Sequence, residues 1–347
     1  MIREAIVKLT GGVSLSEREA SLVMHQIMTG DATSAQIAAY LTALRIKGET
    51  LDEVVGSAQT MRTFAVQIRP RVTQLLDTCG TGGDGANTYN ISTTVAFIVA
   101  GAGLPVAKHG NRSVSSMCGS ADVLEALGVC VDLNPAQVEG CIDEIGIGFL
   151  FSPVFHKAMA HAIGPRREIG IRTIFNILGP LCNPACAQYQ VVGVYQEELT
   201  ELVARTLGRL GAKVALVVHG TDGLDEISLG APTKVSHLQN GTVTTYYVDP
   251  TDFGLAPVKK EQIIGGSARE NAEIIRRVLS GERGAHRDVA LANAAAAFMV
   301  GGLVPDFRSG VQLAGEIVDS GKALEKLHQL QQVSRRYAEN ATAHHYH

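Results

Sequence analysis

Tryptophan is absent from this sequence, and aromatic residues make up only 5% of it. This leaves few platforms on which single-stranded nucleic acid could stack its bases. The net charge of −4 also gives no sequence-wide basic field of the kind that attracts nucleic acid. No apolar run reaches the roughly 18 residues of a membrane span. We therefore expect a protein that binds no nucleic acid and no membrane.

Cysteine patterns typical of metal or disulfide frameworks are missing as well. The six cysteines are scattered, no CxxC pair occurs, and the pair Cys182 and Cys186 encloses a proline without a histidine partner. Zinc binding is therefore disfavoured, and reduced thiols are expected. The first ten residues contain both acidic and basic side chains, which is not typical of a signal peptide. We expect a cytoplasmic protein.

The first 65 residues carry the signals of a small helical unit. Capping boxes stand at 16–19 (S-x-x-E), 33–36 (T-x-x-Q) and 50–53 (T-x-x-E), each followed by apolar residues at helical spacing. This unit contains no obvious chemistry of its own. Its apolar stripe could pack on the rest of the chain or on another subunit.

From about residue 72, short β-like runs alternate with helical ones, as in an α/β domain with a mixed, mostly parallel sheet. Asn240-Gly241 predicts that the last two strands form a hairpin. The predicted strands are 74–77, 104–108, 129–133, 147–151, 190–195, 214–219, 234–238 and 242–248, with helices at 92–102, 120–127 and 197–210.

A Gly-rich stretch, G-T-G-G-D-G at 80–85, lies between a predicted strand and a predicted helix. Converging backbone N–H groups and a helix N-terminus favour a phosphate or pyrophosphate cradle, with an empty tight turn as the alternative. The spacing matches neither a dinucleotide fingerprint nor a P-loop. Asp84 needs a donor such as a sugar hydroxyl. Ser92 and Thr93 could cap the helix, bind phosphate or contact a metal.

A second loop, K-H-G-N-R-S-V-S-S at 108–116, also follows a predicted strand. It concentrates two cations, a histidine, an amide and three hydroxyls, which are the donors that a polyphosphate requires. A solvated polar loop is the alternative interpretation.

Two further stretches complete the pattern. Asp225 and Glu226 follow a predicted strand, and adjacent carboxylates suit Mg²⁺. Arg166 is a natural clamp for a planar carboxylate, although a surface salt bridge is the alternative. The turn formers within 172–185 predict an irregular segment at a junction.

Together these stretches resemble the anthranilate phosphoribosyltransferase family over nearly the whole chain. The resemblance rests on G-T-G-G-D, N-x-S-T at 90–93, the 108–116 loop, G-S-A-D-V-L-E-A-L-G at 119–128, R-T-I-F-N-x-L-G-P-L-x-N-P at 172–184 and the D-E pair. It implies transfer of the phosphoribosyl group of 5-phosphoribosyl 1-pyrophosphate (PRPP) to the amine of anthranilate in tryptophan biosynthesis, with two Mg²⁺ ions.

The resemblance also implies roles for individual residues. Lys108 and Arg112 would stabilise the leaving pyrophosphate. Ser92 would contact one Mg²⁺, and Asp225 and Glu226 would bind the other. The substrate-binding residues would be Gly80, Gly83, Asp84, Thr88, Asn90, Ser92, Thr93, Lys108, His109, Gly110, Asn111, Arg112, Ser113, Ser115, Ser116, Ser120 and Arg166.

Family architecture implies a helical domain at 1–70, joined by a segment near 165–183, and an α/β domain at 71–347. A homodimer through the helical domain is implied as well. One departure is Met117, where the family usually has a lysine, and weaker binding of the phosphoribosyl donor is expected from the lost cation.

Two alternative functions share parts of this pattern. A pyrimidine nucleoside phosphorylase would use inorganic phosphate without a pair of magnesium ions. A non-enzymatic relative that binds nucleic acid should have lost the metal-binding acids and gained a basic face. The pair Asp225 and Glu226, together with the acidic net charge, favours the transferase.

Overall fold

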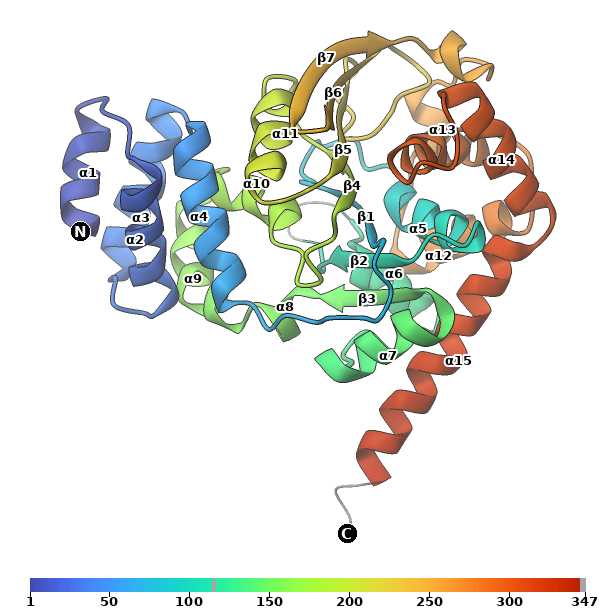
Figure 1. The fold of residues 1–347 in the computed structure, drawn as a ribbon, viewed down its shortest axis with the longest axis horizontal. Coiled ribbons are helices and arrows are strands. Elements are labelled where there is room, and N and C mark those ends of the chain that lie inside the picture. Colours follow the sequence, from blue (N-terminus) through green and yellow to red (C-terminus); the bar gives the residue numbers. More distant parts are fainter. Residues whose placement is uncertain (114–116, 344–347) are drawn as a thin grey trace.

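The computed structural model describes residues 1–113 and 117–343. It contains an N-terminal helical domain beside a larger α/β domain (Figure 1), as expected from the sequence. None of the helices in the described ranges combines the length and apolar character of a membrane span. The division of the chain at residues 70 and 71 stays a prediction.

The helical domain begins with four helices whose starts match the sequence signals. All three predicted capping boxes form, at Ser16, Thr33 and Thr50. The helices are α1 (Ile2–Thr10), α2 (Glu17–Met28), α3 (Ser34–Lys47) and α4 (Leu51–Phe64).

A later segment packs on these helices. It comprises α8 (Ser152–Phe155), a 3₁₀ turn (Lys157–Met159), α9 (Ala160–Ile169) and α10 (Ile174–Leu181); α9 packs on α2 and α3, and α10 packs on α3 and α4. The prediction of an irregular segment is therefore wrong for residues 174–181. Asn176 does not form a turn there, because its Oδ1 accepts the Thr173 N–H at 3.0 Å and caps α10.

The sheet has seven strands in the order β3-β2-β1-β4-β5-β6-β7. The first five of these in space are parallel, while β6 runs antiparallel to both of its neighbours. The predicted hairpin is confirmed, since Asn240 and Gly241 both have positive φ angles, 52° and 75°. The strands are β1 (Leu76–Gly80), β2 (Val106–Gly110), β3 (Ile147–Phe151), β4 (Tyr189–Gly193), β5 (Val214–Gly220), β6 (Thr233–Gln239) and β7 (Thr242–Val248).

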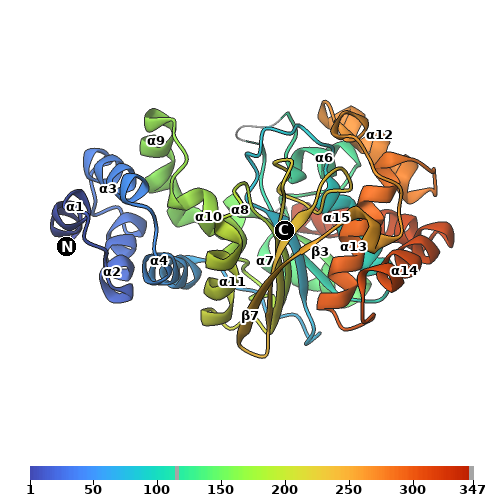
Figure 2. The same cartoon turned by 90° about the horizontal axis from the view of Figure 1, so that it is seen from above.

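Helices cover both faces of the sheet. In Figure 2, α13 and α14 lie on one side, and α10 and α11 lie on the side of the helical domain. Alternation along β5 sends Leu216 and Val218 into the first core and Ala215 and Val217 into a second core shared with the helical domain. The remaining helices are α5 (Ile91–Gly101), α6 (Ser120–Ala126), α7 (Pro135–Ile145), α11 (Leu199–Arg209), α12 (Ala268–Leu279), α13 (Ala285–Val300), α14 (Phe307–Asp319) and α15 (Lys322–Ala343), with 3₁₀ turns at Pro250–Phe253 and Lys260–Ile263.

The predicted strand at 129–133 does not form. Val129, Val131 and Leu133 are buried, so their alternating apolar pattern is real. The backbone nevertheless pairs with a helix, because the Cys130 N–H donates to Ser334 Oγ of α15 at 3.1 Å. An apolar segment packed on a helix has the same burial pattern as a strand, which explains the error.

Inside the helical domain, the buried carboxylate of Glu53 joins three segments. It pairs with Lys47 at 2.9 Å and accepts backbone N–H groups of Leu15 at 2.9 Å and Thr50 at 2.8 Å. Both members of the ion pair are nearly inaccessible to water. These bonds fix the connection between α1 and α2 against the start of α4.

We predict that Glu53→Ala lowers the free energy of unfolding by about 3–5 kcal/mol, because it leaves the Lys47 ammonium buried with hydrogen-bond acceptors but without an opposite charge. Glu201→Ala is the matched control, since it breaks an ion pair with Arg205 of 2.6 Å on the exposed side of α11. The control should cost at most about 1 kcal/mol. Chemical denaturation measures both variants, and equal losses would contradict the assigned role of burial.

Candidate active site

The candidate site lies where the direction of the sheet's winding changes. The chain continues from β1 to β2 and β3 on one side, while β4 and β5 lie on the other side of β1. Loops that leave the carboxyl ends of β1 and β4 therefore diverge and open a crevice between them. The Gly-rich stretch 80–85 leaves β1 at this point.

Asp225 lies at this point and packs closely against the ends of β1 and β4. A side chain on Gly80 would lie 2.7 Å from Asp225 Oδ2, and one on Gly193 would overlap the Asp225 carbonyl oxygen. The Gly82 N–H donates to Asp225 Oδ2 at 2.8 Å. Glycine is therefore required sterically at the end of β4, whereas a side chain at Gly80 would displace the Asp225 carboxylate. The predicted Gly-rich loop and acidic pair meet in space.

Three carboxylates crowd together here. Asp84 Oδ1 accepts the Ala86 N–H at 3.0 Å, and its Oδ2 accepts the Asp225 N–H at 3.4 Å. Burial, followed by the charge of Asp84, raises the pKa of Asp225 to about 7. Burial, followed by Asp225, raises the pKa of Glu226 well above its ordinary value. Such crowding indicates a place for a cation.

These carboxylates fit Mg²⁺, a hard cation that prefers oxygen ligands and usually takes only one or two from protein carboxylates. Within the described ranges, no group of three or more His, Cys, Asp or Glu side chains could hold a metal by itself. A magnesium ion at Asp225 and Glu226 would therefore need further ligands from water or from a bound phosphate.

Lys108 and Ser92 lie beside this acidic group. The buried Lys108 ammonium donates to the Thr78 carbonyl oxygen at 2.5 Å and to Ser92 Oγ at 3.3 Å. Burial lowers the pKa of Lys108, and the charges of Asp77 and Glu226 oppose that effect. The predicted cation is thus next to the predicted metal ligands.

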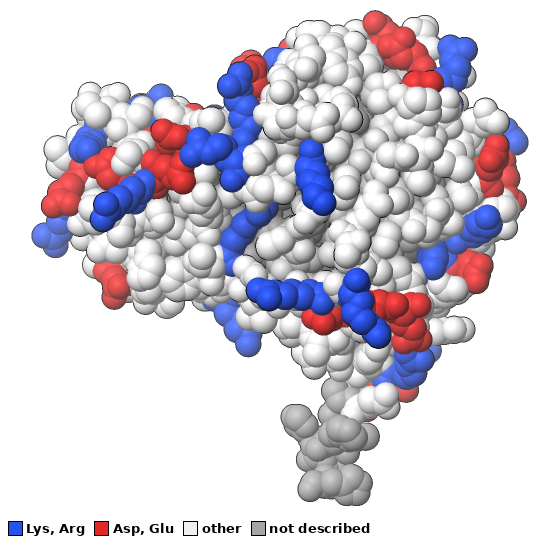
Figure 3. Space-filling view, viewed as in Figure 1, with Lys and Arg blue, Asp and Glu red and all other residues white. Residues whose placement is uncertain are grey.

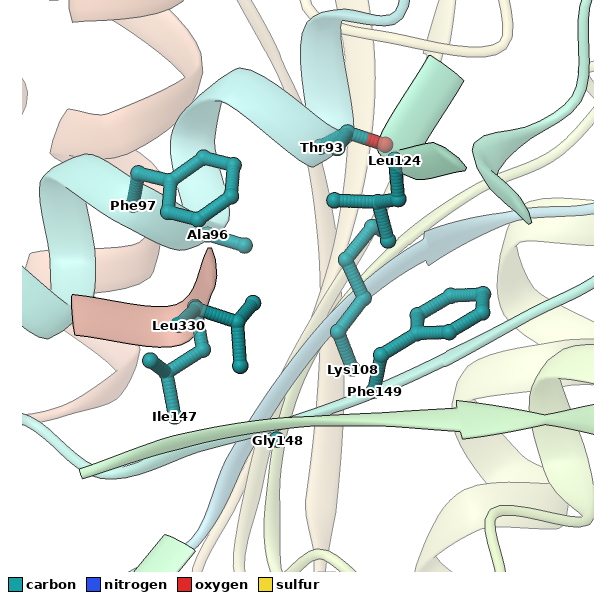
Figure 4. Close-up of a pocket in the computed structure, with 9 residues that line it drawn as sticks. All are labelled: Thr93, Ala96, Phe97, Lys108, Leu124, Ile147, Gly148, Phe149 and Leu330. Carbon is teal, nitrogen blue, oxygen red and sulfur yellow. The ribbon is translucent and has the colours of Figure 1, made fainter. Parts of the chain in front are cut away.

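The aliphatic stem of Lys108 crosses the apolar interior. With Thr93, Phe97 and Phe149 it bounds a cavity of about 10 Å³ (Figure 4). A cavity of this size holds at most about one water molecule. Thr93 Oγ1 is buried without a hydrogen-bond partner. This gap is too small for a substrate.

The start of α5 is hydrogen-bonded to α12, which is distant in sequence. The sequence did not predict this contact. Asn90 Oδ1 accepts from Asn271 Nδ2 of α12 at 2.9 Å, and Asn90 Nδ2 donates to the Cys118 carbonyl oxygen at 3.2 Å. Thr88 bridges to Ile264 as an isolated β-bridge. No sequence signal marked Asn271, because the contact spans 181 residues.

The second predicted loop divides between the crevice and α6. Ser120 Oγ accepts the Asn111 N–H at 3.2 Å, and a side chain on Gly110 would overlap that hydroxyl. Arg112, predicted to stabilise a leaving group, instead pairs with Asp122 at 3.0 Å and Glu125 at 2.6 Å. Ser115 and Ser116 lie outside the described residues.

Two buried histidines come together near α10, one of which the sequence interpretation did not assign to the site. The rings of His109 and His156 lie 5.1 Å apart, and each leaves its Nε2 buried without a partner. Burial lowers the pKa of both, to about 4 for His156. The pair therefore presents two neutral imidazoles with free nitrogen atoms.

The α9–α10 segment carries two arginines, of which Arg172 reaches the Gly-rich loop. The Arg166 guanidinium lies 4.9 Å from the ring centre of Phe175, and burial lowers its pKa. Arg172, which was not predicted as a site residue, donates to the Gly83 carbonyl oxygen and lies 4.5 Å from the ring centre of Tyr195. The Gly-rich loop is thus bonded to both domains.

Charge on the face drawn in Figure 3 is mixed. Acidic and basic side chains are both scattered over a largely uncharged face, without a broad region of one sign. This pattern does not resemble the basic stripe of a nucleic-acid-binding surface.

Comparison with known proteins identifies the family. The family model described as "Glycosyl transferase family, a/b domain" matches residues 72–324, and "Glycosyl transferase family, helical bundle domain" matches residues 3–65. The anthranilate phosphoribosyltransferase of Acetivibrio thermocellus is 56% identical over 327 residues, covering 94% of this chain and 95% of the relative. That of Symbiobacterium thermophilum is 56% identical over 325 residues with the same coverage. The chain belongs to the anthranilate phosphoribosyltransferase family.

Solved structures agree with this assignment. The anthranilate phosphoribosyltransferase of Thermus thermophilus has a TM-score of 0.91 and 42% identity, covering 95% of this chain and 99% of its own. The Saccharomyces cerevisiae enzyme in complex with PRPP and Mg has a TM-score of 0.88 and 28% identity, covering 96% of this chain and 98% of its own. The anthranilate phosphoribosyltransferase fold, predicted from the sequence motifs, is thereby confirmed.

We predict that Asp225→Asn stabilises the metal-free protein and abolishes its stabilisation by Mg²⁺. The raised pKa means that the folded protein binds the Asp225 proton more tightly than the unfolded chain does, so stability falls as pH rises through about 7. The variant should therefore melt several degrees higher than wild type near pH 8, by a smaller margin near pH 5, and equally only below about pH 4, where the carboxyl of the unfolded chain is protonated as well. Thermal scans with EDTA or Mg²⁺ measure this, and a variant that Mg²⁺ still stabilises equally would contradict the metal assignment.

Proposed function

We propose that this protein transfers the phosphoribosyl group of PRPP to the anthranilate amine, giving N-(5-phosphoribosyl)anthranilate and pyrophosphate in tryptophan biosynthesis. The observation that carries the residue-level proposal is the packing of Asp225 against Gly80 and Gly193. It joins the Gly-rich loop to the acidic pair, so one crevice offers backbone N–H groups for phosphates and carboxylates for a cation.

The donor would bind between the Gly-rich loop, the start of α5 and the second loop. Backbone N–H groups at a helix N-terminus favour phosphate oxygens. Asp84 would accept from ribose hydroxyls. The donor-binding set is Gly80, Gly83, Asp84, Thr88, Asn90, Ser92, Thr93, Lys108, His109, Gly110, Asn111, Arg112, Ser113, Ser115, Ser116 and Ser120.

Magnesium would be held by Asp225 and Glu226, with a second ion at Ser92. Bound there, Mg²⁺ supplies positive charge that stabilises the departing pyrophosphate. The crowding of Asp84, Asp225 and Glu226, which raises the pKa values of the latter two, supports a cation at this place. The use of two ions is part of the proposal.

Lys108 would contribute the protein's own charge on the leaving-group side. Its ammonium is fixed by Thr78 and Ser92, so little reorganisation accompanies charge development on the pyrophosphate. Arg112 can contribute only if it leaves Asp122 and Glu125. An aryl amine is a weak nucleophile, and orientation of its nitrogen toward the ribose carbon supplies much of the remaining rate.

Anthranilate would lie on the side of the helical domain. Within the described ranges Arg166 forms no ion pair with a carboxylate and is only partly exposed. Its guanidinium suits the anthranilate carboxylate, and Asn111 and Gly80 would be further contacts of anthranilate. The neutral pair His109 and His156 offers an uncharged wall for the ring.

Assembly and compartment complete the proposal. The helical domain leaves several large apolar side chains exposed, which supports a homodimer through this domain. These side chains are Val7, Val13, Leu22, Ile46 and Ile163. A cytoplasmic location is proposed from the scattered free cysteines.

The function is tested by the loss of anthranilate fluorescence after PRPP is added. We expect a loss with Mg²⁺ and none with EDTA, because the carboxylates need the cation to bind the donor. The double variant Asp225→Ala/Glu226→Ala should be inactive under both conditions. Stable fluorescence with folded wild-type protein and Mg²⁺ would overturn the proposed function.

We predict that Arg166→Ala raises the KM for anthranilate at least roughly tenfold, the effect of one lost charge-assisted hydrogen-bond pair. The KM for PRPP should stay within about twofold, because donor contacts are unchanged. Arg167→Ala, an exposed neighbour on α9, is the control and should leave both constants unchanged. An equal rise in both KM values for Arg166→Ala would indicate a structural role instead.

A further inference from the structure

Asp122, which no assignment above places in the site, connects both ends of the segment between β2 and α6. Its Oδ2 accepts the backbone N–H of Gly119 at 2.9 Å and that of Ser113 at 3.0 Å. Its Oδ1 accepts from Arg112 Nη1 at 3.0 Å. One carboxylate therefore holds two backbone positions and one cationic side chain.

The first bond is an ordinary helix cap, but the other two are not. Asp122 is the third residue of α6 and receives the N–H of the capping residue Gly119, as in a capping box. A cap requires nothing from Ser113 or Arg112, which precede it by nine and ten residues. These additional bonds join the outgoing end of β2 to the start of α6.

Sterics at Gly119 support this connection. A side chain on Gly119 would overlap the Ser113 nitrogen and would lie 2.5 Å from the Arg112 carbonyl carbon. The two ends of the segment thus touch without room for a methyl group. Ser120 adds a second link, because its Oγ bonds with both the N–H and the carbonyl oxygen of Asn111 at 3.2 Å.

We propose that Asp122 is a positioning residue for the phosphoribosyl donor. It contacts no substrate and acts through the backbone of Ser113 and Gly119, which it holds in the arrangement that the donor meets. This inference rests on the proposed donor-binding role of residues 108–113 and of Ser120.

The protonation state of the carboxylate is consistent with this arrangement. Burial raises the pKa of Asp122, but the two backbone N–H groups and Arg112 outweigh burial, and the net pKa is lowered. The side chain is therefore an anion under assay conditions, and each of its bonds is charge-assisted.

Three variants test the proposal in the full-length enzyme, with steady-state constants for PRPP and anthranilate. Asp122→Ala should raise the KM for PRPP roughly tenfold or more, as expected for lost hydrogen bonds to a charged acceptor. Asp122→Asn should stay within about threefold, because one amide oxygen can still accept both backbone N–H groups. The KM for anthranilate should change by less than about twofold in both variants.

Glu19→Ala is the control, because Glu19 has the same local contacts in α2. It is the third helical residue, accepts the Ser16 N–H at 3.0 Å and pairs with Lys8 at 2.5 Å. This variant should lose thermal stability without a change in either KM. A PRPP KM that Asp122→Ala leaves unchanged, or an equal rise in both constants, overturns the proposal.

Hydrogen exchange of the wild-type protein provides a test that does not depend on folding of a variant. The Ser113 and Gly119 amides should be protected without ligand, since both are bonded to Asp122. Exchange at the rate of an unstructured peptide would overturn the proposal. An inactive wild-type enzyme would instead contradict the proposed function, so the two failures are distinguishable.

Discussion

The close approach of Asp225 to Gly80 and Gly193 is the constraint on which the site depends. It brings the segment after β5 across the carboxyl ends of β1 and β4, where the winding of the sheet reverses. A side chain at Gly193 would force the backbone of that segment away, and one at Gly80 would displace the Asp225 carboxylate. The Gly82 N–H then bonds to the same carboxylate, so the geometry of the Gly-rich loop and of the acidic pair is set by one contact.

This arrangement has an electrostatic cost in the protein alone. Asp84, Asp225 and Glu226 repel one another, and Lys108 is the cation beside them that favours ionisation of Glu226. The fold holds these partly buried carboxyl groups together despite the repulsion, which shifts Asp225 and Glu226 toward their protonated forms. The same repulsion would become favourable binding energy if a divalent cation entered as proposed. Local instability and the proposed metal affinity would then be two consequences of one charge arrangement.

Local signals predicted this fold well, and distant contacts explain the errors. Capping boxes and the Asn240-Gly241 turn depend on neighbouring residues, and each formed as predicted. The 129–133 segment failed because its partner, α15, lies about 200 residues away in sequence. Asn271, Arg172 and His156 were missed for the same reason. The predicted loops and carboxylates do converge, but the sequence did not predict that Arg112 pairs with Asp122 and Glu125 of α6.

One buried side chain explains how the two domains share a site. Asn183, at the end of the segment that packs on the helical domain, donates to Asp77 Oδ2 at 2.7 Å and to the Ala107 carbonyl oxygen at 2.8 Å. Asp77 Oδ1 in turn accepts the His109 N–H at 3.2 Å. The segment that carries Arg166 is therefore fixed directly to β1 and β2, beside Lys108. Because Asp77 is fully buried, breaking this connection would leave polar groups without partners in the core. The segment that carries Arg166, where anthranilate is proposed to bind, therefore cannot move independently of β1 and β2 at Asn183. These two strands lead into the loops proposed to bind PRPP.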